Sequence, residues 1–314
     1  MVVTMKKKFA LMLSVSMAVG TVLAGCGSAA KDAAQTAAGA EEQADTDSAQ
    51  EAANAAESTD DVTAEGTEET GTDSDTASVD TDLIYAVEAG SAGEAAAQDN
   101  GLQTNVVTSQ ADALMEVAAG TSDAAIIDLL MAGAMIGEGT SYPNLTHTTE
   151  LTTEEYGVGC RKGSDLASYI NAVFGESYAD GTMKETAAVY GVQEALVEQP
   201  ASEFVASAED SDVAYIQEKG NLIIGITEFE PMDYKDESGE WVGFDADMAR
   251  LTAEKLGVEA QFVVIDWDNK IMELESKTID VVWNGMTLTA ETTSAMECTN
   301  AYCNNAQVIV VPAE

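Results

Sequence analysis

The chain has 314 residues, of which 56 are Asp or Glu and 13 are Lys or Arg, for a formal net charge of -43 at pH 7. A polyanion of this kind is repelled by nucleic-acid phosphates and by anionic lipid surfaces, which excludes both as binding partners. His147 is the single histidine. A catalytic triad and a histidine-rich metal site are therefore excluded. We expect His147 on a surface strand. We also expect no cofactor.

The amino terminus has the pattern of a targeting segment. Lys6 to Lys8 precede an apolar run, Phe9 to Val22, that is too short to span a membrane, and Leu23-Ala24-Gly25-Cys26 follows. A small-residue pair directly before a cysteine is typical of a bacterial lipobox, whereas the alternative is an ordinary secretory signal with a chance cysteine. We favour the lipobox, with a signal peptide at 1–25. Acyl chains on Cys26 would then anchor the protein at the outer face of the cytoplasmic membrane or in the periplasm.

Residues 26–81 are predicted to form a disordered acidic tether. Between positions 27 and 80 Ala, Thr, Ser, Gly, Asp and Glu dominate, no aromatic residue occurs, and Lys31 is the only cation. Such a composition buries too little apolar surface to offset the entropy of the chain. The folded part should therefore begin near residue 82, and no apolar run after the signal is long enough for a transmembrane helix.

Residues 82–149 alternate strand and helix patterns. Strands are predicted at 83–87, 103–107 and 124–127, with helices between them. Asp128 follows the third strand, where it either receives a ligand's cation or caps the next helix. Gly90-Ser91-Ala92-Gly93 either presents backbone N–H groups to an anion or is a plain tight turn.

Residues 221–289 repeat this β-α-β-α-β pattern. Strands are predicted at 222–226, 261–265 and 279–283, with an amphipathic helix that stops at Gly257 and a short helix around Ile271. In doubly wound sheets ligands bind at the carboxyl ends of the strands. The loops after the first and third strands should converge there, bringing together Glu228, Phe229, Asn284, Gly285 and Thr287.

The run KGNLIIGITEFEPMDYKDESGEWVGFDADMARLTAEKLGVEAQFVVIDWDNKI, at 219–271, resembles the start of the mature polar-amino-acid solute-binding proteins of ABC importers (family 3). Residues 83–193, with AAIIDLLMAGAM, EEYGVGCRKGS and GTMKETAAVYG, resemble the second lobe and closing helices of the same family. What the family places last therefore comes first here, which indicates a circular permutation.

The resemblance implies an α/β fold of the type II periplasmic-binding-protein kind, with two doubly wound lobes joined by a two-strand hinge. One lobe would comprise 82–158 with 306–314, and the other 159–305, including a linker at 192–213 that has no family counterpart. Gln307 to Val311 should accordingly pair in the sheet built by 82–155.

The resemblance also assigns ligand-binding roles. Asp128, the Gly285 carbonyl and Thr287 would hold an ammonium group, and Phe229 and Trp267 would stack on the ligand, although both aromatics could equally be core residues. The full predicted set is Asp128, Ser91, Ala92, Phe229, Glu228, Trp267, Asn284, Gly285 and Thr287.

Two positions depart from the family pattern. Thr292 stands where the family has the arginine that clamps a ligand carboxylate, and the nearest arginine in sequence is Arg250. Glu88 stands where some relatives have lysine. A hydroxyl cannot replace a bidentate guanidinium, so acidic ligands should be disfavoured.

These patterns predict a monomeric, lipid-anchored receptor that binds a neutral or basic amino acid between two lobes and delivers it to an ABC permease. The alternatives are an enzyme on the same fold, similar to the dehydratases of aromatic amino-acid precursors, and a ligand sensor without transport. We expect a binding protein rather than an enzyme. Cys160, Cys298 and Cys303 form no CxxC pattern, and a disulfide between the last two or free thiols are both open.

Overall fold

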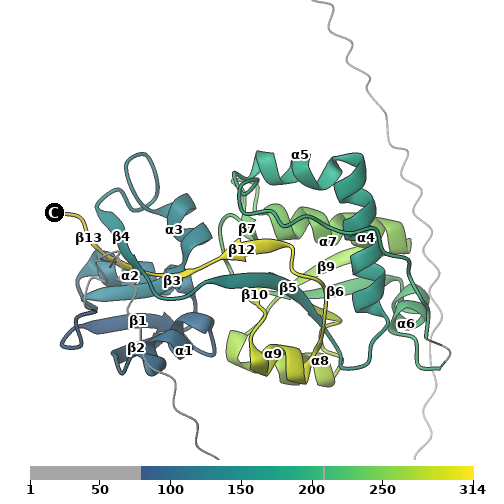
Figure 1. The fold of residues 1–314 in the computed structure, drawn as a ribbon, viewed down its shortest axis with the longest axis horizontal. Coiled ribbons are helices and arrows are strands. Elements are labelled where there is room, and N and C mark those ends of the chain that lie inside the picture. The colour runs from purple at the N-terminus through teal and green to yellow at the C-terminus, as the bar shows by residue number, and fades with distance from the viewer. Residues whose placement is uncertain (1–78, 208) are drawn as a thin grey trace, which may run out of the picture. The chain divides into compact units, whose positions relative to one another are not determined.

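The computed structural model describes residues 79–207 and 209–314 (Figure 1). The predicted signal peptide, Cys26 and nearly all of the tether lie outside the described residues. Among the described helices, none combines the length and the hydropathy needed to cross a membrane. The fold is mixed α/β, with two larger sheets and a two-stranded ribbon.

The first sheet has five strands in the order β2-β1-β3-β13-β4. They are β1 (Ile84–Glu88), β2 (Gln103–Val107), β3 (Ala124–Asp128), β4 (Leu145–Glu150) and β13 (Gln307–Pro312). Parallel β1, β2 and β3 alternate with α1 (Ala92–Asp99) and α2 (Gln110–Ala119), while α3 (Leu129–Met135) follows β3. Every residue of β3 is buried, which is why its sequence is a continuous apolar run up to Asp128. His147 is exposed on β4, as expected.

The last strand of the chain completes this sheet, as the sequence predicted. Gln307 pairs with Asp128 and Val308 with Ile127 in antiparallel register, and the other edge of β13 pairs with β4. The apolar residues Val308 to Val310 are all buried. A central strand with an apolar sequence is stable only between two neighbours, so β13 returns to this sheet across the whole intervening chain.

The second sheet runs β11-β5-β10-β6-β9, with β12 also paired to β5. Its strands are β5 (Glu154–Cys160), β6 (Asn221–Ile226), β9 (Glu259–Val264), β10 (Val281–Thr287), β11 (Glu297–Cys298) and β12 (Cys303–Asn305). Strands β7 (Tyr234–Lys235) and β8 (Trp241–Val242) form the separate ribbon. The helices are α4 (Leu166–Asp180), α5 (Thr182–Val189), α6 (Asp212–Lys219), α7 (Phe244–Leu256), α8 (Lys270–Glu275) and α9 (Ala290–Ala295), with a 3-10 turn η1 (Trp267–Asn269).

The structure corrects one predicted boundary in this sheet. The third strand was expected to end before Asn284, but β10 continues through Asn284 and Gly285 to Thr287. A bulge between Val282 and Met286 accommodates this stretch, and Gly285 has a φ of 56°. Only glycine adopts this conformation readily inside a strand, so the Asn-Gly pair marks a bulge rather than a turn.

The chain passes between the two sheets at two places, β4 to β5 and β12 to β13. We call residues 79–153 with 306–314 the five-stranded half, and residues 154–305 the six-stranded half. The two passages are bonded together, because Leu151 N donates to Gln307 O (2.8 Å) and Gln307 N to Thr152 Oγ1 (2.9 Å). Since β5 begins at Glu154, the six-stranded sheet starts before the predicted boundary at 158/159.

The segment predicted as a linker, 192–213, is packed against the six-stranded half. Its backbone bonds the passage through β12, with Val197 N donating to Tyr302 O (2.8 Å) and Asn304 N to Ala195 O (2.7 Å). A side chain at Gly175 of α4 would put its Cβ 2.5 Å from Pro200 O, so the segment lies directly on that helix. Its last residues already belong to α6. Cys160, Cys298 and Cys303 are all free, so no Cys298–Cys303 disulfide is present.

Candidate functional site

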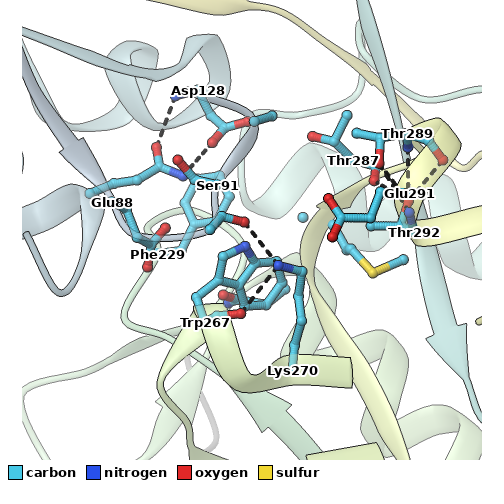
Figure 2. A pocket seen from close by; sticks show the side chains of 16 residues that line it. Glu88, Ser91, Asp128, Phe229, Trp267, Lys270, Thr287, Thr289, Glu291 and Thr292 are labelled. Carbon is cyan, nitrogen blue, oxygen red and sulfur yellow. Dashed lines mark hydrogen bonds between the residues drawn. The ribbon is translucent and has the colours of Figure 1, made fainter. Parts of the chain in front are cut away.

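A cavity lies where the two halves face each other, at the carboxyl ends of the parallel strands (Figure 2). Including the open solvent at its mouth, the space measures about 520 Å³. The five-stranded half contributes Glu88, Gly90, Ser91, Ala92, Gln110 and Asp128. The six-stranded half contributes Phe229, Trp267, Lys270, Asn284, Gly285 and Met286, with Thr287, Thr289, Glu291 and Thr292.

The structure brings together every predicted ligand-binding residue except Glu228. That side chain is exposed to solvent and does not line the cavity, whereas the adjacent Phe229 is buried and does. Successive side chains alternate in direction along extended backbone, so only one of these two neighbours can face inward.

Asp128 is the most heavily bonded group of the site. Its Oδ1 accepts from the Tyr156 hydroxyl (2.6 Å), from the Gln307 amide (3.0 Å) and from Asn305, while Gln110 donates to its Oδ2. Its side chain makes no helix-capping bond to α3, so the capping interpretation is wrong. Burial, followed by the nearby Glu154 carboxylate, raises the pKa of Asp128 to about 7.

A second carboxylate, Glu154, lies beside Asp128 and was missed at the level of sequence. Its Oε2 accepts from Thr287 (3.1 Å), Asn305 (3.2 Å) and Gln307 (3.0 Å). Asn305 and Gln307 thus donate to both carboxylates, and they sit on one of the two passages between the sheets. The network therefore connects the cavity directly to the segments that join the halves.

Glu88 ends β1 and is only 2% exposed. Its Oε1 is buried and has no hydrogen-bond partner within residues 79–207 and 209–314. Burial, and next the charge of Asp128, raise the pKa of Glu88 to about 8, although Lys270 and Gln110 act in the opposite direction. From the sequence, Glu88 was a departure from a family pattern and a candidate crevice carboxylate, and it was not included in the predicted ligand-binding set.

Lys270, at the first turn of α8, is the single cationic side chain among the described residues that line the cavity. Its Nζ donates across the cavity to Gly90 O (2.9 Å) and within its own half to Trp267 O (3.2 Å), and it lies 5.1 Å from the centre of the Trp267 ring (Figure 2). Burial lowers the pKa of Lys270, and Glu291 and Glu88 oppose that effect. The only sequence signal was a lysine three positions after the predicted crevice aromatic Trp267.

The aromatic residues serve both as cavity wall and as core. Phe229 is 2% and Trp267 7% exposed, and the Phe229 ring meets Tyr156 edge to face at 6.3 Å. A Cβ on Gly285 would lie 2.5 Å from the Phe229 ring, so this ring closes against the β10 bulge. Phe229 and Trp267 can therefore be core residues and still face a ligand, so the two roles left open by the sequence are compatible.

An acidic pair lies directly behind the bulge. Asn284 Nδ2 donates to Asp233 (2.8 Å), and Gly285 N and the Tyr302 hydroxyl donate to Asp245 (both 2.7 Å). Both aspartates are fully buried, and burial raises the pKa of each, with Asp245 further raising that of Asp233. Asn284 is also bonded to Thr227 through both ends of its amide, so its role is to hold the cavity wall.

The groups expected to bind a ligand carboxylate are already engaged. Ser91 Oγ accepts from Glu94 N (3.1 Å), and the Glu94 carboxylate accepts from Gly90 N (2.7 Å), so the start of α1 is capped by its own residues. Thr292, at the position of the family arginine, forms a capping box with Thr289. Arg250 bonds Asp247 and Trp241 and does not line the cavity.

The described part of the chain contains no cluster of His, Cys, Asp and Glu suited to a metal ion. The cavity instead combines two buried carboxylates, Glu88 and Asp128, an exposed one, Glu291, and the single ammonium of Lys270. Such a lining attracts cations, and it has an apolar floor in Phe229, Trp267 and Met286.

Comparison with known proteins finds a family whose model matches the carboxyl-terminal part of the chain. Residues 222–314 match the model of the bacterial extracellular solute-binding proteins, family 3. That segment is similar to this family. The L-cystine-binding protein TcyJ of Escherichia coli (strain K12) is 33% identical over 85 residues, which cover 27% of this chain and 32% of the relative. The arginine-binding extracellular protein ArtP of Bacillus subtilis (strain 168) is 34% identical over 93 residues, covering 29% and 36%.

A further relative is an enzyme, the cyclohexadienyl dehydratase of Pseudomonas aeruginosa, which is 32% identical over 85 residues that cover 27% of this chain and 32% of the relative. Among solved structures, the arginine-bound form of domain 1 from TmArgBP is 31% identical and covers 31% of this chain and 84% of that chain, with a TM-score of 0.25. The chain spans about a third of the length of the curated relatives it matches. The family-3 segment contains Phe229, Trp267 and Lys270, whereas Glu88 and Asp128 lie outside it.

Proposed function

We propose that this protein is an extracytoplasmic substrate-binding protein of an ABC importer, which closes two lobes around a neutral or basic amino acid. The family-3 segment supports a role in solute binding. The observation that carries the proposal is the position of the cavity, which is walled by both halves while the chain connects them at only two places. A ligand in such a cavity touches both halves at once.

Closure would follow from differential binding. A ligand that contacts both halves stabilises only the arrangement in which they meet, and so shifts the population toward it. The contacts made across the cavity, such as the bond from Lys270 Nζ to Gly90 O, belong to that arrangement. The closed form is then the one recognised by a permease.

The proposed lobes are the two halves, and their order in the chain is that of a circularly permuted family member. The pairing of β13 with β3 and β4 supports this order, because the strand after the family-3 segment joins the sheet that precedes that segment in sequence. We further propose that Cys26 carries the lipid that anchors the receptor, and that the receptor acts as a monomer.

The ligand class follows from charge. Asp128 and Glu88 suit an ammonium or another cation, while the arginine position holds the capping residue Thr292. An additional carboxylate near these groups, at about 4 Å, would cost on the order of 1 to 4 kcal/mol, or roughly five- to thousandfold in affinity. Glutamate and aspartate are therefore the poorest candidates.

Isothermal titration calorimetry of the full-length protein in detergent tests this proposal. Glutamine, histidine, lysine, arginine, cystine and glutamate form the panel, and Asp128→Asn should weaken binding by about tenfold or more because it removes the charge that faces the ammonium. The thermal melting curve of Asp128→Asn controls for folding, since this side chain accepts four hydrogen bonds. Glutamate binding tighter than glutamine, lysine and arginine, or the absence of binding across the panel, would contradict the proposal.

A dehydratase-like enzyme is the second candidate, favoured by the enzyme among the relatives and by two buried carboxyl groups with raised pKa values. A protonated carboxylic acid can act as a general acid at neutral pH. An anionic substrate would however meet Lys270 as its only cation in the described cavity lining. Turnover of a cyclohexadienyl acid, followed by ultraviolet absorbance and abolished by Glu88→Gln, would favour the enzyme; no turnover alongside amino-acid binding would favour the receptor.

A further inference from the structure

One carboxylate oxygen of Glu88, Oε1, is an unpaired acceptor in the wall of the cavity. The residue is 2% exposed, and its Oε1 has no hydrogen-bond partner among the described residues. Leaving a buried polar atom unpaired costs about 1 to 3 kcal/mol, and more when the group is charged. Such atoms are rare in folded proteins and call for a specific explanation. Here the atom belongs to a residue that lines the cavity between the two halves.

The groups around Glu88 do not satisfy it. Lys270 is close enough to act on its pKa, but the Lys270 ammonium bonds the carbonyls of Gly90 and Trp267 instead (Figure 2). The other charged neighbours are Asp128 from the end of β3 and Asp112 from α2, which are both acidic. Gln110 bonds Asp128 at both ends of its amide, and its interaction with the Glu88 carboxyl leaves Oε1 unpaired. The missing partner of Glu88 is therefore a hydrogen-bond donor, and a positive charge fits this acidic surrounding best.

We propose that Glu88 receives a second cationic group of the ligand, so that the site selects basic amino acids with a guanidinium or ammonium side chain over neutral ones. This inference rests on the proposed function and narrows its ligand class. Asp128 and Glu88 end neighbouring strands β3 and β1 of one sheet, so two carboxylates face the cavity from adjacent positions. Two acidic groups side by side match the two cationic groups of a basic amino acid.

The protonation of Glu88 gives an independent readout. With a pKa of about 8, Glu88 is largely protonated at neutral pH, in the field of Asp128, Asp112 and Lys270. A bound cation favours the ionised form, so binding should release a proton from Glu88. Affinity for a basic amino acid should therefore rise as the pH increases toward 8, and the enthalpy of binding should depend on the buffer.

The experiment compares arginine with citrulline, which has the same shape but no side-chain charge, on the full-length protein. Wild type should prefer arginine by about tenfold or more, and Glu88→Gln should remove this preference while citrulline affinity stays within about threefold. Glu228→Gln is the matched control, because it removes the same charge from an exposed residue that does not line the cavity and should retain most of the preference. Melting curves of both variants verify that they are folded.

The outcomes separate this inference from the proposed function. Binding of citrulline or glutamine by wild type without any preference for arginine overturns the inference alone, as does an arginine preference that survives Glu88→Gln. Binding of no amino acid by wild type overturns the proposed function first. Wild-type affinity that increases as the pH falls from about 8 to about 6 would show protonated Glu88 donating to a ligand carboxylate. That result would also overturn the inference that Glu88 receives a cationic group.

Discussion

Gly90 offers the sharpest test of closure, because it touches the opposite half across the cavity. Its φ is +67°, and a Cβ added there would lie 2.8 Å from both Cα and Oδ1 of Asp268 in the opposite half. The Asp268 side chain can rotate away, but its Cα cannot move without the backbone. Gly90→Ala therefore opposes the contact between the halves as well as straining the local backbone.

The two effects can be given separate magnitudes. An L-residue in the left-handed region costs about 1 to 2 kcal/mol wherever it occurs, and this lowers stability but not affinity. The overlap with Asp268 adds about 1 to 3 kcal/mol only in the arrangement where the halves meet. Because ligand binding draws on that arrangement, the apparent Kd should rise by about five- to 150-fold.

Gly101 provides a matched control in the same half. It has the same φ of +67°, and a Cβ there would meet nothing within 4 Å. Gly101→Ala should lower the melting temperature about as much as Gly90→Ala and leave the affinity unchanged. The assay is calorimetric titration with the amino acid that wild type binds most tightly, alongside thermal melting. Equal affinities for wild type and Gly90→Ala, or an equal loss in both variants, would refute the reasoning.

Three further predictions concern other parts of the chain. If Cys26 carries lipid, wild type should enter the detergent phase and Cys26→Ala should be released or accumulate unprocessed; wild type found wholly in the aqueous phase would contradict this. Truncation after Asn304 removes β13 and leaves the edges of β3 and β4 unpaired, so limited proteolysis should degrade the five-stranded half first; uniform resistance would argue against that role of the strand. Because burial raises the pKa values of Asp233 and Asp245, the folded protein binds more protons than the unfolded chain above about pH 4, and stability should fall as the pH rises toward the raised values. Melting temperatures measured from about pH 4 upward should show this decline in stability, and Asp233→Asn should make the decline shallower. An unchanged dependence of melting temperature on pH in the variant would exclude Asp233 and Asp245 as the cause.

The local patterns of the sequence predicted the main strands and helices of the two β-α-β-α-β stretches. Apolar runs such as Leu222 to Ile226 predict buried strands, and the amphipathic stripe ending at Gly257 predicts α7, which does stop there. The pairing of Gln307 to Val311 with the distant sheet followed from the order of motifs. The Asn284-Gly285 pair was misjudged as a strand end, because a bulge and a turn both favour the same residues and only the pairing of β10 distinguishes them.

The charge chemistry of the site was decided by the tertiary structure. The sequence placed Asp128 at a strand end, but its neighbours Glu154, Asn305 and Gln307 come from distant parts of the chain. Lys270 and Glu88 are 182 positions apart (270 minus 88) and line one cavity. Periodicity depends on neighbours a few residues away and so can be read locally, whereas desolvation and unpaired hydrogen-bonding groups depend on which segments pack together. The sequence by itself therefore determined strands, helices and the strand ends where a site belongs, and only packing decided that Glu88 is left without a partner there.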